Sequence, residues 1–410
     1  MTVNYNLEKI DGGVCAAKGF LASGVHCGIR KNKTKRDLAL IYSRTKASTA
    51  CVYTQNLVKG APIYVTKKNV SDGYANAVIC NSGNANTCNK NGVEIAEKMC
   101  DALAEVLDIS SSDVVVASTG VIGQPLDIDP IKNGIPSLVA TLSEDGSNMA
   151  AEGIMTTDTK LKEISFKFYI NGVECHIGGI AKGSGMIHPN MATMLVFITS
   201  DVAITPAALQ KVLSEDIKRS FNMISVDGDT STNDMVCVMA NGEAANIVLD
   251  ENSEYLSVFA DALSQTTTYL CRCIAADGEG ATKLLECVVN GGDNYENTAA
   301  VAKSVICSSL VKAAMFGSDA NWGRVLCAIG YSGVDVDVDK VDVSFKSSYG
   351  VVDVCRDGRG IDFSEEIAKK VLSEDEVQIC VELNSGDVTA TAWGCDLTYD
   401  YVKINGDYRT

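Results

Sequence analysis

The sequence predicts an α+β fold of layered mixed sheets and helices, and two observations carry this prediction. Strand-like and helix-like segments both recur along the 410 residues, but they do not alternate strictly, as they would in a doubly wound parallel sheet. A strong turn signal at Asn171-Gly172, between two strand-like segments, predicts an antiparallel hairpin. Because single cores rarely grow beyond about 250–300 residues, this length allows two or three packed units.

In the first 120 residues, short apolar segments between turn residues predict strands, and one segment with apolar residues at helical spacing predicts a helix. The predicted strands are 37–41, 50–53, 62–65, 77–80 and 114–117, and the predicted helix is 92–108. The last of these strands leads directly into Ser118-Thr119-Gly120.

The middle of the chain continues the mixed pattern. A helix near Ile131 precedes the hairpin strands, and an apolar run from Met194 to Ile198 predicts a buried strand. Thr205-Pro206 predicts the start of a helix, because threonine caps helix N-termini well and proline fits the first helical position. The predicted hairpin strands are 163–170 and 174–177.

The last 160 residues predict further helices and a return to strands. The predicted helices are 253–276, 297–315 and one near 364–372. Segment 283–289 reads as a strand, strands return from Val334 onward, and Asn384-Ser385-Gly386-Asp387 is typical of a hairpin turn.

Composition excludes several classes of function. With 35 Lys and Arg against 52 Asp and Glu, the formal net charge is −17, which argues against nucleic-acid binding. The one basic run, 30–36, is expected to be a solvated loop.

No apolar run approaches the roughly 18 residues of a membrane span, and the first residues lack the charged and apolar regions of a signal peptide. We therefore expect a cytoplasmic protein whose 16 cysteines stay reduced. Without a C-x-x-C pair, and with three scattered histidines, no structural metal is expected.

The segment from Ile180 to Asp201 holds the candidate nucleophile. A glycine-rich loop leads to Thr193, which stands directly before the predicted buried strand. A threonine hydroxyl needs a base, and His188 stands five positions before Thr193 with a proline between them, so we expect this histidine to be structural. If the Ala192-Thr193 bond were cut, the new α-amine, with a pKa of roughly 7.7–8.0, would be that base. The alternative is a buried strand that merely begins with threonine.

Residues 182–195, Lys-Gly-Ser-Gly-Met-Ile-His-Pro-Asn-Met-Ala-Thr-Met-Leu, resemble the self-cleavage segment of the ornithine acetyltransferase (glutamate N-acetyltransferase) family of arginine biosynthesis. Further similar blocks keep the order of that family along the chain. They are 81–86, 118–123, 155–159, 225–234, 277–283, 319–324 and 404–410.

The resemblance implies the fold of the self-processing ornithine acetyltransferases and aminopeptidases, with cleavage between Ala192 and Thr193. An α-chain of residues 1–192 and a β-chain of residues 193–410 would then assemble as an α2β2 heterotetramer. The implied reaction moves acetyl from N2-acetylornithine to glutamate through an acetyl-threonine, and it needs no bound cofactor. Some members of the family also use acetyl-CoA as an acetyl donor, and no residue in this sequence shows whether this protein does.

The resemblance also implies a set of site residues. Thr119 and Gly120 match the pair that stabilises the oxyanion, through a hydroxyl and a backbone N–H respectively. Lys182 matches a substrate-binding lysine and suits the α-carboxylate of both substrates, while Glu279 suits the extra ammonium of ornithine. The substrate-binding set is Thr156, Lys182, Thr193, Glu279, Asn405 and Thr410.

Two other classes of function stay open at this point. A hydrolase related to the N-terminal-nucleophile aminopeptidases and amidases would form the same acyl-threonine but pass it to water. A binding protein that is never cleaved would keep its chain intact.

Overall fold

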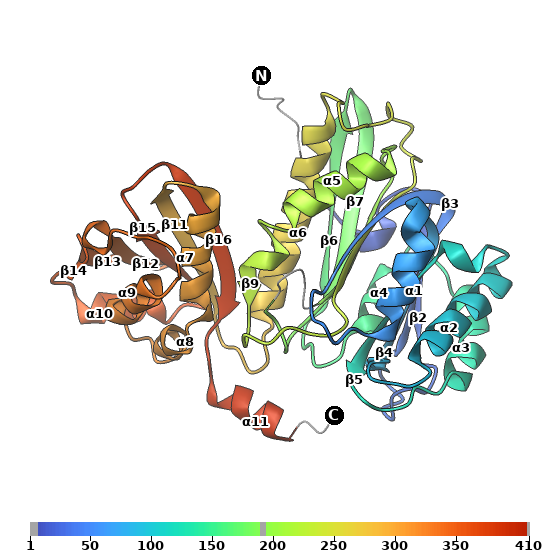
Figure 1. Ribbon diagram of the computed structural model, residues 1–410, viewed down its shortest axis with the longest axis horizontal. Helices are drawn as coiled ribbons and strands as arrows, with labels where there is room; N and C mark the ends of the chain where they lie inside the picture. The colour runs from blue at the N-terminus through green and yellow to red at the C-terminus, as the bar shows by residue number, and fades with distance from the viewer. Residues whose placement is uncertain (1–6, 189–193, 408–410) are drawn as a thin grey trace.

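Two mixed β-sheets organise the chain, and helices cover their faces (Figure 1). The computed structural model describes residues 7–188 and 194–407. Within these residues the larger sheet runs in the order β1-β6-β7-β8-β10-β3-β4-β5, with β2 paired to β3. Its strands are β1 Glu8–Ile10, β2 Phe20–Val25, β3 Leu38–Tyr53, β4 Tyr74–Asn84, β5 Val114–Val121, β6 Lys162–Ile170, β7 Val173–Lys182, β8 Leu195–Ser200 and β10 Met235–Ala240.

The smaller sheet lies in the C-terminal part of the chain and runs in the order β14-β13-β12-β15-β11-β16-β9. Its strands are β9 Ile224–Ser225, β11 Leu284–Gly292, β12 Asp342–Ser347, β13 Gly350–Arg356, β14 Arg359–Gly360, β15 Glu376–Glu382 and β16 Val388–Cys395. The α-helices are α1 Ala61–Asn69, α2 Gly92–Leu107, α3 Asp129–Ala140, α4 Ser147–Ile154, α5 Pro206–Asp216, α6 Leu256–Ala276, α7 Tyr295–Cys307, α8 Ser309–Phe316, α9 Trp322–Gly330, α10 Glu365–Leu372 and α11 Tyr399–Asp407.

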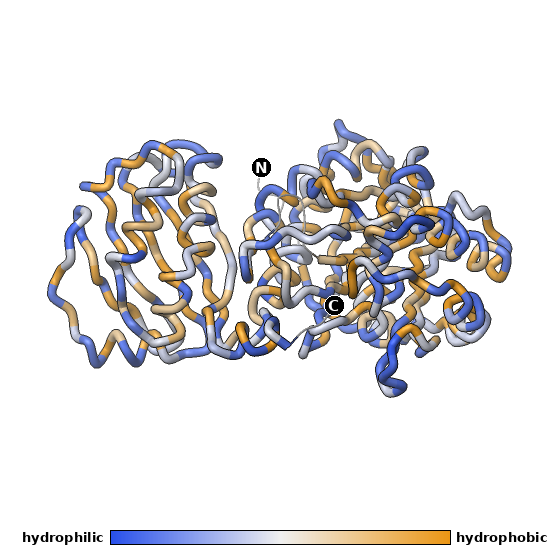
Figure 2. The backbone as a smooth tube through the Cα atoms, turned by 60° about the horizontal axis from the view of Figure 1, so that its bottom comes forward, coloured by the Kyte–Doolittle hydropathy of each residue, from blue (hydrophilic) through white to orange (hydrophobic). Residues whose placement is uncertain are grey.

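Strand β8 shows why the larger sheet is covered on both faces. Leu195 and Phe197 pack into a core on one face, whereas Val196 and Ile198 pack into a core on the other, because successive strand side chains point to opposite faces. The second core continues to the smaller sheet, and helix α6 contacts strands of both sheets. Hydrophobic residues accordingly follow the strands of both units, while many outer loops are hydrophilic (Figure 2).

The predicted α+β class and the central hairpin are confirmed. Strands β6 and β7 pair antiparallel up to Ile170 and Val173. Between them Asn171 and Gly172 have φ of 47° and 79°. Both residues therefore adopt the positive φ that a tight two-residue hairpin turn requires.

Two of the predicted elements are wrong. Segment 62–65 belongs to helix α1, where Pro62 stands in the first turn and Ile63 and Val65 are buried, so tertiary packing overrides their β propensity. The predicted hairpin at Asn384–Asp387 does not form, because β15 and β16 lie on opposite sides of β11, the first parallel to it and the second antiparallel.

Other boundaries differ from the prediction. Strands 37–41 and 50–53 are parts of the single long strand β3. The helix predicted at 297–315 is two helices, because Ser308 caps α8 by accepting a hydrogen bond from the N–H of Val311. Among the described residues no single helix is long and apolar enough to cross a membrane; α7 and α8 meet that requirement only as a pair, and they are bent by 55°.

Candidate active site

A cavity of about 310 Å³ collects residues from both halves of the sequence. Six predicted site residues line it: Thr119, Gly120, Thr156, Lys182, Glu279 and Asn405. Ala192, Thr193 and Thr410 lie outside the described residues. A larger cavity of about 420 Å³, against the smaller sheet, contains none of the predicted residues. We therefore regard the smaller cavity as the candidate site, and the roles of its residues stay predictions.

Thr119 and Gly120 stand at an irregularity between β4 and β5. Gly83 pairs with Gly120, and the register then shifts so that Asn84 faces both Thr119 and Val121. Gly120 has a φ of 129°, and a Cβ there would lie 2.4 Å from the carbonyl carbon of Gly83. The approach of the neighbouring strand therefore requires glycine at position 120, in addition to any approach by a substrate.

Lys182, the last residue of β7, brings a buried cation to the cavity. It is 8% exposed and pairs in register with Leu195 of β8. Its Nζ lies 4.0 Å from Oδ2 of Asp158, beyond hydrogen-bond distance. A cation in such a place suits the carboxylate of a small substrate.

Asp158 links the two segments that carry Lys182 and Thr156. Its Oδ1 accepts a hydrogen bond from the N–H of Gly183 (2.7 Å), and its Oδ2 accepts one from the N–H of Thr156 (2.9 Å). Burial alone would raise the pKa of Asp158, but the ammonium groups of Lys182 and Lys162 hold it well below its usual range. The side chain is therefore a carboxylate at neutral pH.

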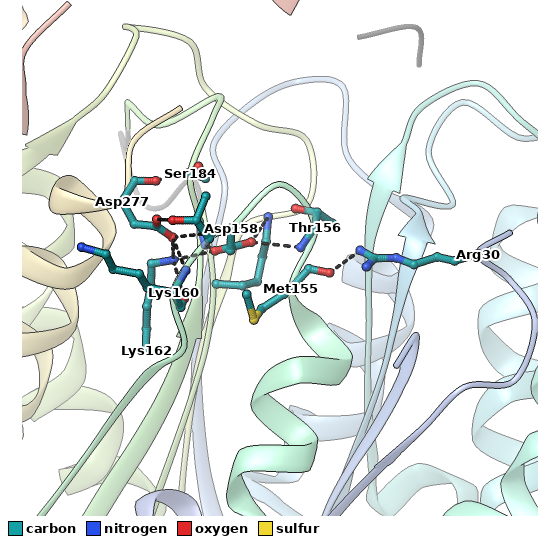
Figure 3. A network of polar contacts seen from close by, with 11 residues as sticks. Arg30, Met155, Thr156, Asp158, Lys160, Lys162, Ser184 and Asp277 are labelled. Atoms are coloured by element: carbon teal, nitrogen blue, oxygen red, sulfur yellow. Dashed lines mark hydrogen bonds and ion pairs between the residues drawn. The ribbon is translucent and has the colours of Figure 1, made fainter. Parts of the chain in front are cut away.

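Lys162 extends this network to the end of helix α6 (Figure 3). The side chain is 1% exposed, and its Nζ lies 2.7 Å from Oδ1 of Asp158 and 2.5 Å from Oδ2 of Asp277. The carbonyl of Asp277 accepts a hydrogen bond from the hydroxyl of Ser184 (2.7 Å). The loop after β7 and the end of α6 are thus joined by buried polar contacts.

Glu279 supplies a carboxylate to the cavity. Its N–H donates to the carbonyl of Ser184 (3.1 Å), and its Oε2 accepts a hydrogen bond from Nδ2 of Asn405 (2.9 Å). A Cβ at Gly185 would lie 2.4 Å from this carboxyl group, so a side chain there would displace the carboxyl group of Glu279 from its position. Among the described residues no cation forms an ion pair with Glu279, which suits an ammonium group of a ligand.

Sequence reasoning assigned no role to Asn233, which also lines the cavity. Its Nδ2 donates to the carbonyls of Ala85 (2.6 Å) and Ser118 (2.9 Å), and its Oδ1 accepts from the hydroxyls of Thr87 (2.6 Å) and Thr232 (2.5 Å). The side chain of Asn233 is 7% exposed, and its hydrogen bond to Ser118 fixes the residue directly before Thr119. Its place within a block that resembles the family was the available signal.

His188 lies beside the site rather than in its lining. Its Nδ1 is 3.1 Å from Oγ of Ser225 and 3.5 Å from Sγ of Cys307. Burial and the nearby ammonium of Lys303 lower the pKa of His188 to about 4. The imidazole is therefore neutral at working pH, and its structural role stays a prediction.

Within residues 7–188 and 194–407, no group of three or more His, Cys, Asp or Glu side chains could hold a metal ion. The expectation of no metal remains a prediction for the whole chain.

The structure is thus an α+β protein whose cavity combines a buried ammonium with a carboxylate, and this charge pair suits an amino-acid ligand. A sequence profile of the ArgJ family matches residues 21–410, and the chain belongs to this family.

Curated relatives extend over nearly the whole chain. A protein from Caldanaerobacter subterraneus subsp. tengcongensis is 49% identical over 405 residues, covering 98% of this chain and 100% of its own length. One from Clostridium acetobutylicum is 50% identical over 393 residues, covering 95% and 96%. They are described as arginine biosynthesis bifunctional proteins ArgJ and ArgJ 1.

Two solved structures are similar to parts of the chain. The crystal structure of arginine biosynthesis bifunctional protein ArgJ from Bacillus halodurans has 47% identity and a TM-score of 0.50, covering 53% of this chain and 100% of that chain. An ornithine acetyltransferase from Mycobacterium tuberculosis, solved with ornithine, has 34% identity and a TM-score of 0.43, covering 46% and 100%. The predicted family is confirmed: the chain is an arginine-biosynthesis enzyme of the ornithine acetyltransferase class, and the aminopeptidase alternative is not supported.

Proposed function

We propose that this enzyme transfers acetyl from N2-acetylornithine to glutamate through an acetyl-threonine at Thr193, giving ornithine and N-acetylglutamate. The observation that carries this proposal is the cavity, where Lys182 and Glu279 place opposite charges beside Thr119 and Gly120. Lys182 would bind the α-carboxylate that both substrates share, with Thr156 beside it. Glu279 and Asn405 would bind the side-chain ammonium of ornithine.

The reaction proceeds in two matched steps. The hydroxyl of Thr193 attacks the acetyl carbonyl and gives its proton to the α-amine of the same residue. The hydroxyl of Thr119 and the N–H of Gly120 donate to the oxyanion, the C–N bond breaks, and the α-amine of ornithine leaves with the proton. The α-amine of glutamate then attacks acetyl-Thr193 by the reverse sequence and restores the free threonine.

This chemistry requires a free threonine N-terminus, so we further propose self-cleavage into residues 1–192 and 193–410. The solved Bacillus halodurans chain supports this division, because its whole length corresponds to 53% of this chain, and residues 193–410 are 218 of 410, which is also 53%. Strands β8 and β10 of the second segment lie between β7 and β3 of the first. The two products would therefore stay together as one sheet.

We also propose an α2β2 assembly in the cytoplasm, with Thr410 among the substrate-binding residues and no bound cofactor. The word bifunctional in the descriptions of the relatives supports acetyl-CoA as a second acetyl donor for glutamate.

The test combines intact mass with product analysis. Wild-type protein should give fragments of about 20 and 23 kDa, which are 192/410 and 218/410 of 43.4 kDa, and Thr193→Ala should give one chain. Wild-type enzyme with N2-acetylornithine and glutamate should release equal amounts of ornithine and N-acetylglutamate. An intact wild-type chain, or acetate as the main product, would refute the proposal, and Thr199→Ala, in strand β8, controls for loss of another threonine.

A further inference from the structure

Two lysines share the carboxylate of Asp158 at unequal distances. Nζ of Lys162 lies 2.7 Å from Oδ1, whereas Nζ of Lys182 lies 4.0 Å from Oδ2. Lys182 lines the cavity, but Lys162 does not, and it is 1% exposed. The nearer lysine therefore satisfies the carboxylate, while the farther one faces the space that a substrate would occupy.

The surrounding charges leave this arrangement balanced. Asp277 also contacts Lys162 (2.5 Å). The charges of the two ammonium groups, Lys162 and Lys182, are therefore balanced by those of the two carboxylates, Asp158 and Asp277. Asp234 also acts on Lys182, but burial raises the pKa of Asp234 well above its usual range, which disfavours the charged form of this carboxyl group. Asp158 is thus the carboxylate that competes with a substrate for Lys182.

Loss of Lys162 would change this competition. A buried carboxylate without a close cation is unfavourable, and Coulomb attraction strengthens as the distance shortens. Asp158 would then draw Lys182 toward itself, out of the position that a substrate carboxylate needs. We propose that Lys162 is a positioning residue, which keeps Lys182 available for the substrate carboxylate by pairing with Asp158.

This inference rests on the proposed role of Lys182 and deepens it. Both substrates carry an α-carboxylate, so affinity for both should depend on Lys162. The acyl chemistry at Thr193 uses other groups, so the maximal rate should depend on it much less. Of the two variants that disturb the pair, only the loss of Lys162 should raise KM, which a general structural role does not require.

The experiment compares Lys162→Met, Asp158→Asn and the double variant in the full processed enzyme. Lys162→Met should raise KM for N2-acetylornithine and for glutamate about tenfold, with kcat changed less than threefold. Asp158→Asn gives up one of its two backbone hydrogen bonds and should change KM less than threefold, and the double variant should restore KM to within about threefold of wild type. Parallel losses of kcat and Tm in all three variants, without this rescue, would overturn the inference.

Two further measurements keep the result decisive. N-acetyl-1,4-diaminobutane lacks the carboxylate, so its kcat/KM should be the same in wild type and Lys162→Met; an equal loss for both donors would overturn the inference. If Lys162→Met does not fold, a tenfold rise of KM in Asp158→Asn would also overturn it.

If wild-type enzyme forms no N-acetylglutamate, the proposed function fails. Ornithine binding to the same variants, measured by calorimetry, still tests the role of Lys162 in that case.

Discussion

Asn405 donates a hydrogen bond to Glu279 over 2.9 Å, although 126 residues separate them in the chain. Asn405 stands on helix α11, which has no buried residue among those described. Few contacts hold this helix, among them a hydrogen bond from Thr398 to the carbonyl of Gly280 (2.7 Å) and the edge-on contact of Tyr399 with Phe316. The orientation of Glu279 therefore depends on a weakly anchored helix.

Replacement of Asn405 should weaken binding of the ammonium substrate selectively. Asn405→Ala removes the donor to Glu279 and should raise KM for N2-acetylornithine about three- to tenfold, with a smaller effect on KM for glutamate. Asn405→Asp places a second carboxylate beside Glu279 and should perturb binding further. Steady-state kinetics measures both, and Val402→Ala, on the exposed part of α11, is the matched control. Equal changes of KM for the two substrates would contradict this account.

Gly120→Ala should be far more harmful than the same change three residues later. At Gly120 a Cβ would lie 2.4 Å from backbone and would also strain the positive φ, so we expect a loss of about 3 kcal/mol and nearly all activity. Gly123 also has a positive φ, of 79°, but nothing lies within 4 Å of its Cβ position. Gly123→Ala should therefore lose only the stability that backbone strain costs, about 1 kcal/mol. Thermal unfolding and transfer rates of the two variants test this, and similar losses in both would argue against the contact with Gly83.

Local signals in the sequence predicted the parts of the fold that depend on a few adjacent residues. Asn171-Gly172 determines a two-residue turn by itself, and the prediction was right. At Asn384–Asp387 a similar signal predicted a hairpin that does not form, because the strands on either side pair with β11 instead. Pairing between strands that are distant in sequence cannot be read from the turn between them.

The candidate site shows the same limit. Family resemblance indicated Lys182 and Glu279, and both line the cavity. Nothing local indicated that Lys162 pairs with Asp277, 115 residues away, or that Asn233 holds the carbonyl of Ser118. These side chains satisfy buried partners that only the folded chain brings together, so no periodicity or short motif announces them.

Asn233→Asp should disrupt the wall of the cavity. An aspartate can still accept from Thr87 and Thr232, but it cannot donate to the carbonyls of Ala85 and Ser118, and it introduces a buried charge. We expect a loss of stability of about 3 kcal/mol and a lower kcat, since Ser118 precedes Thr119. Melting temperature and kcat should fall together. Asn241→Asp, at a partly exposed amide outside the cavity lining, should leave kcat unchanged, and an unaltered kcat in Asn233→Asp would contradict the prediction.

The buried carboxyl of Asp216 should make stability depend on pH. Burial raises its pKa to about 6, although hydrogen bonds from Thr267, Ser220 and Ser264 oppose the shift. The folded state therefore holds a proton that the unfolded state, with a pKa of 3.8, has lost between those values. The stability from this group is fully present below about pH 4 and is lost as pH rises through 6, by an amount on the order of 2–3 kcal/mol.

Asp216→Asn keeps an uncharged side chain at every pH and so removes this dependence. The variant should melt at a higher temperature than wild type at pH 8, and the difference should vanish near pH 4. The measurement is the difference in Tm between variant and wild type from pH 4 to 8. Taking this difference removes the contribution of every other titrating group, because those groups are the same in both proteins. Asp261→Asn, at an exposed position of α6, should leave the profile unchanged. Asp216→Asn could instead melt at a lower temperature than wild type at pH 8. The ionised carboxylate of Asp216 would then stabilise the folded state, and the direction assigned to the pKa of Asp216 would be wrong.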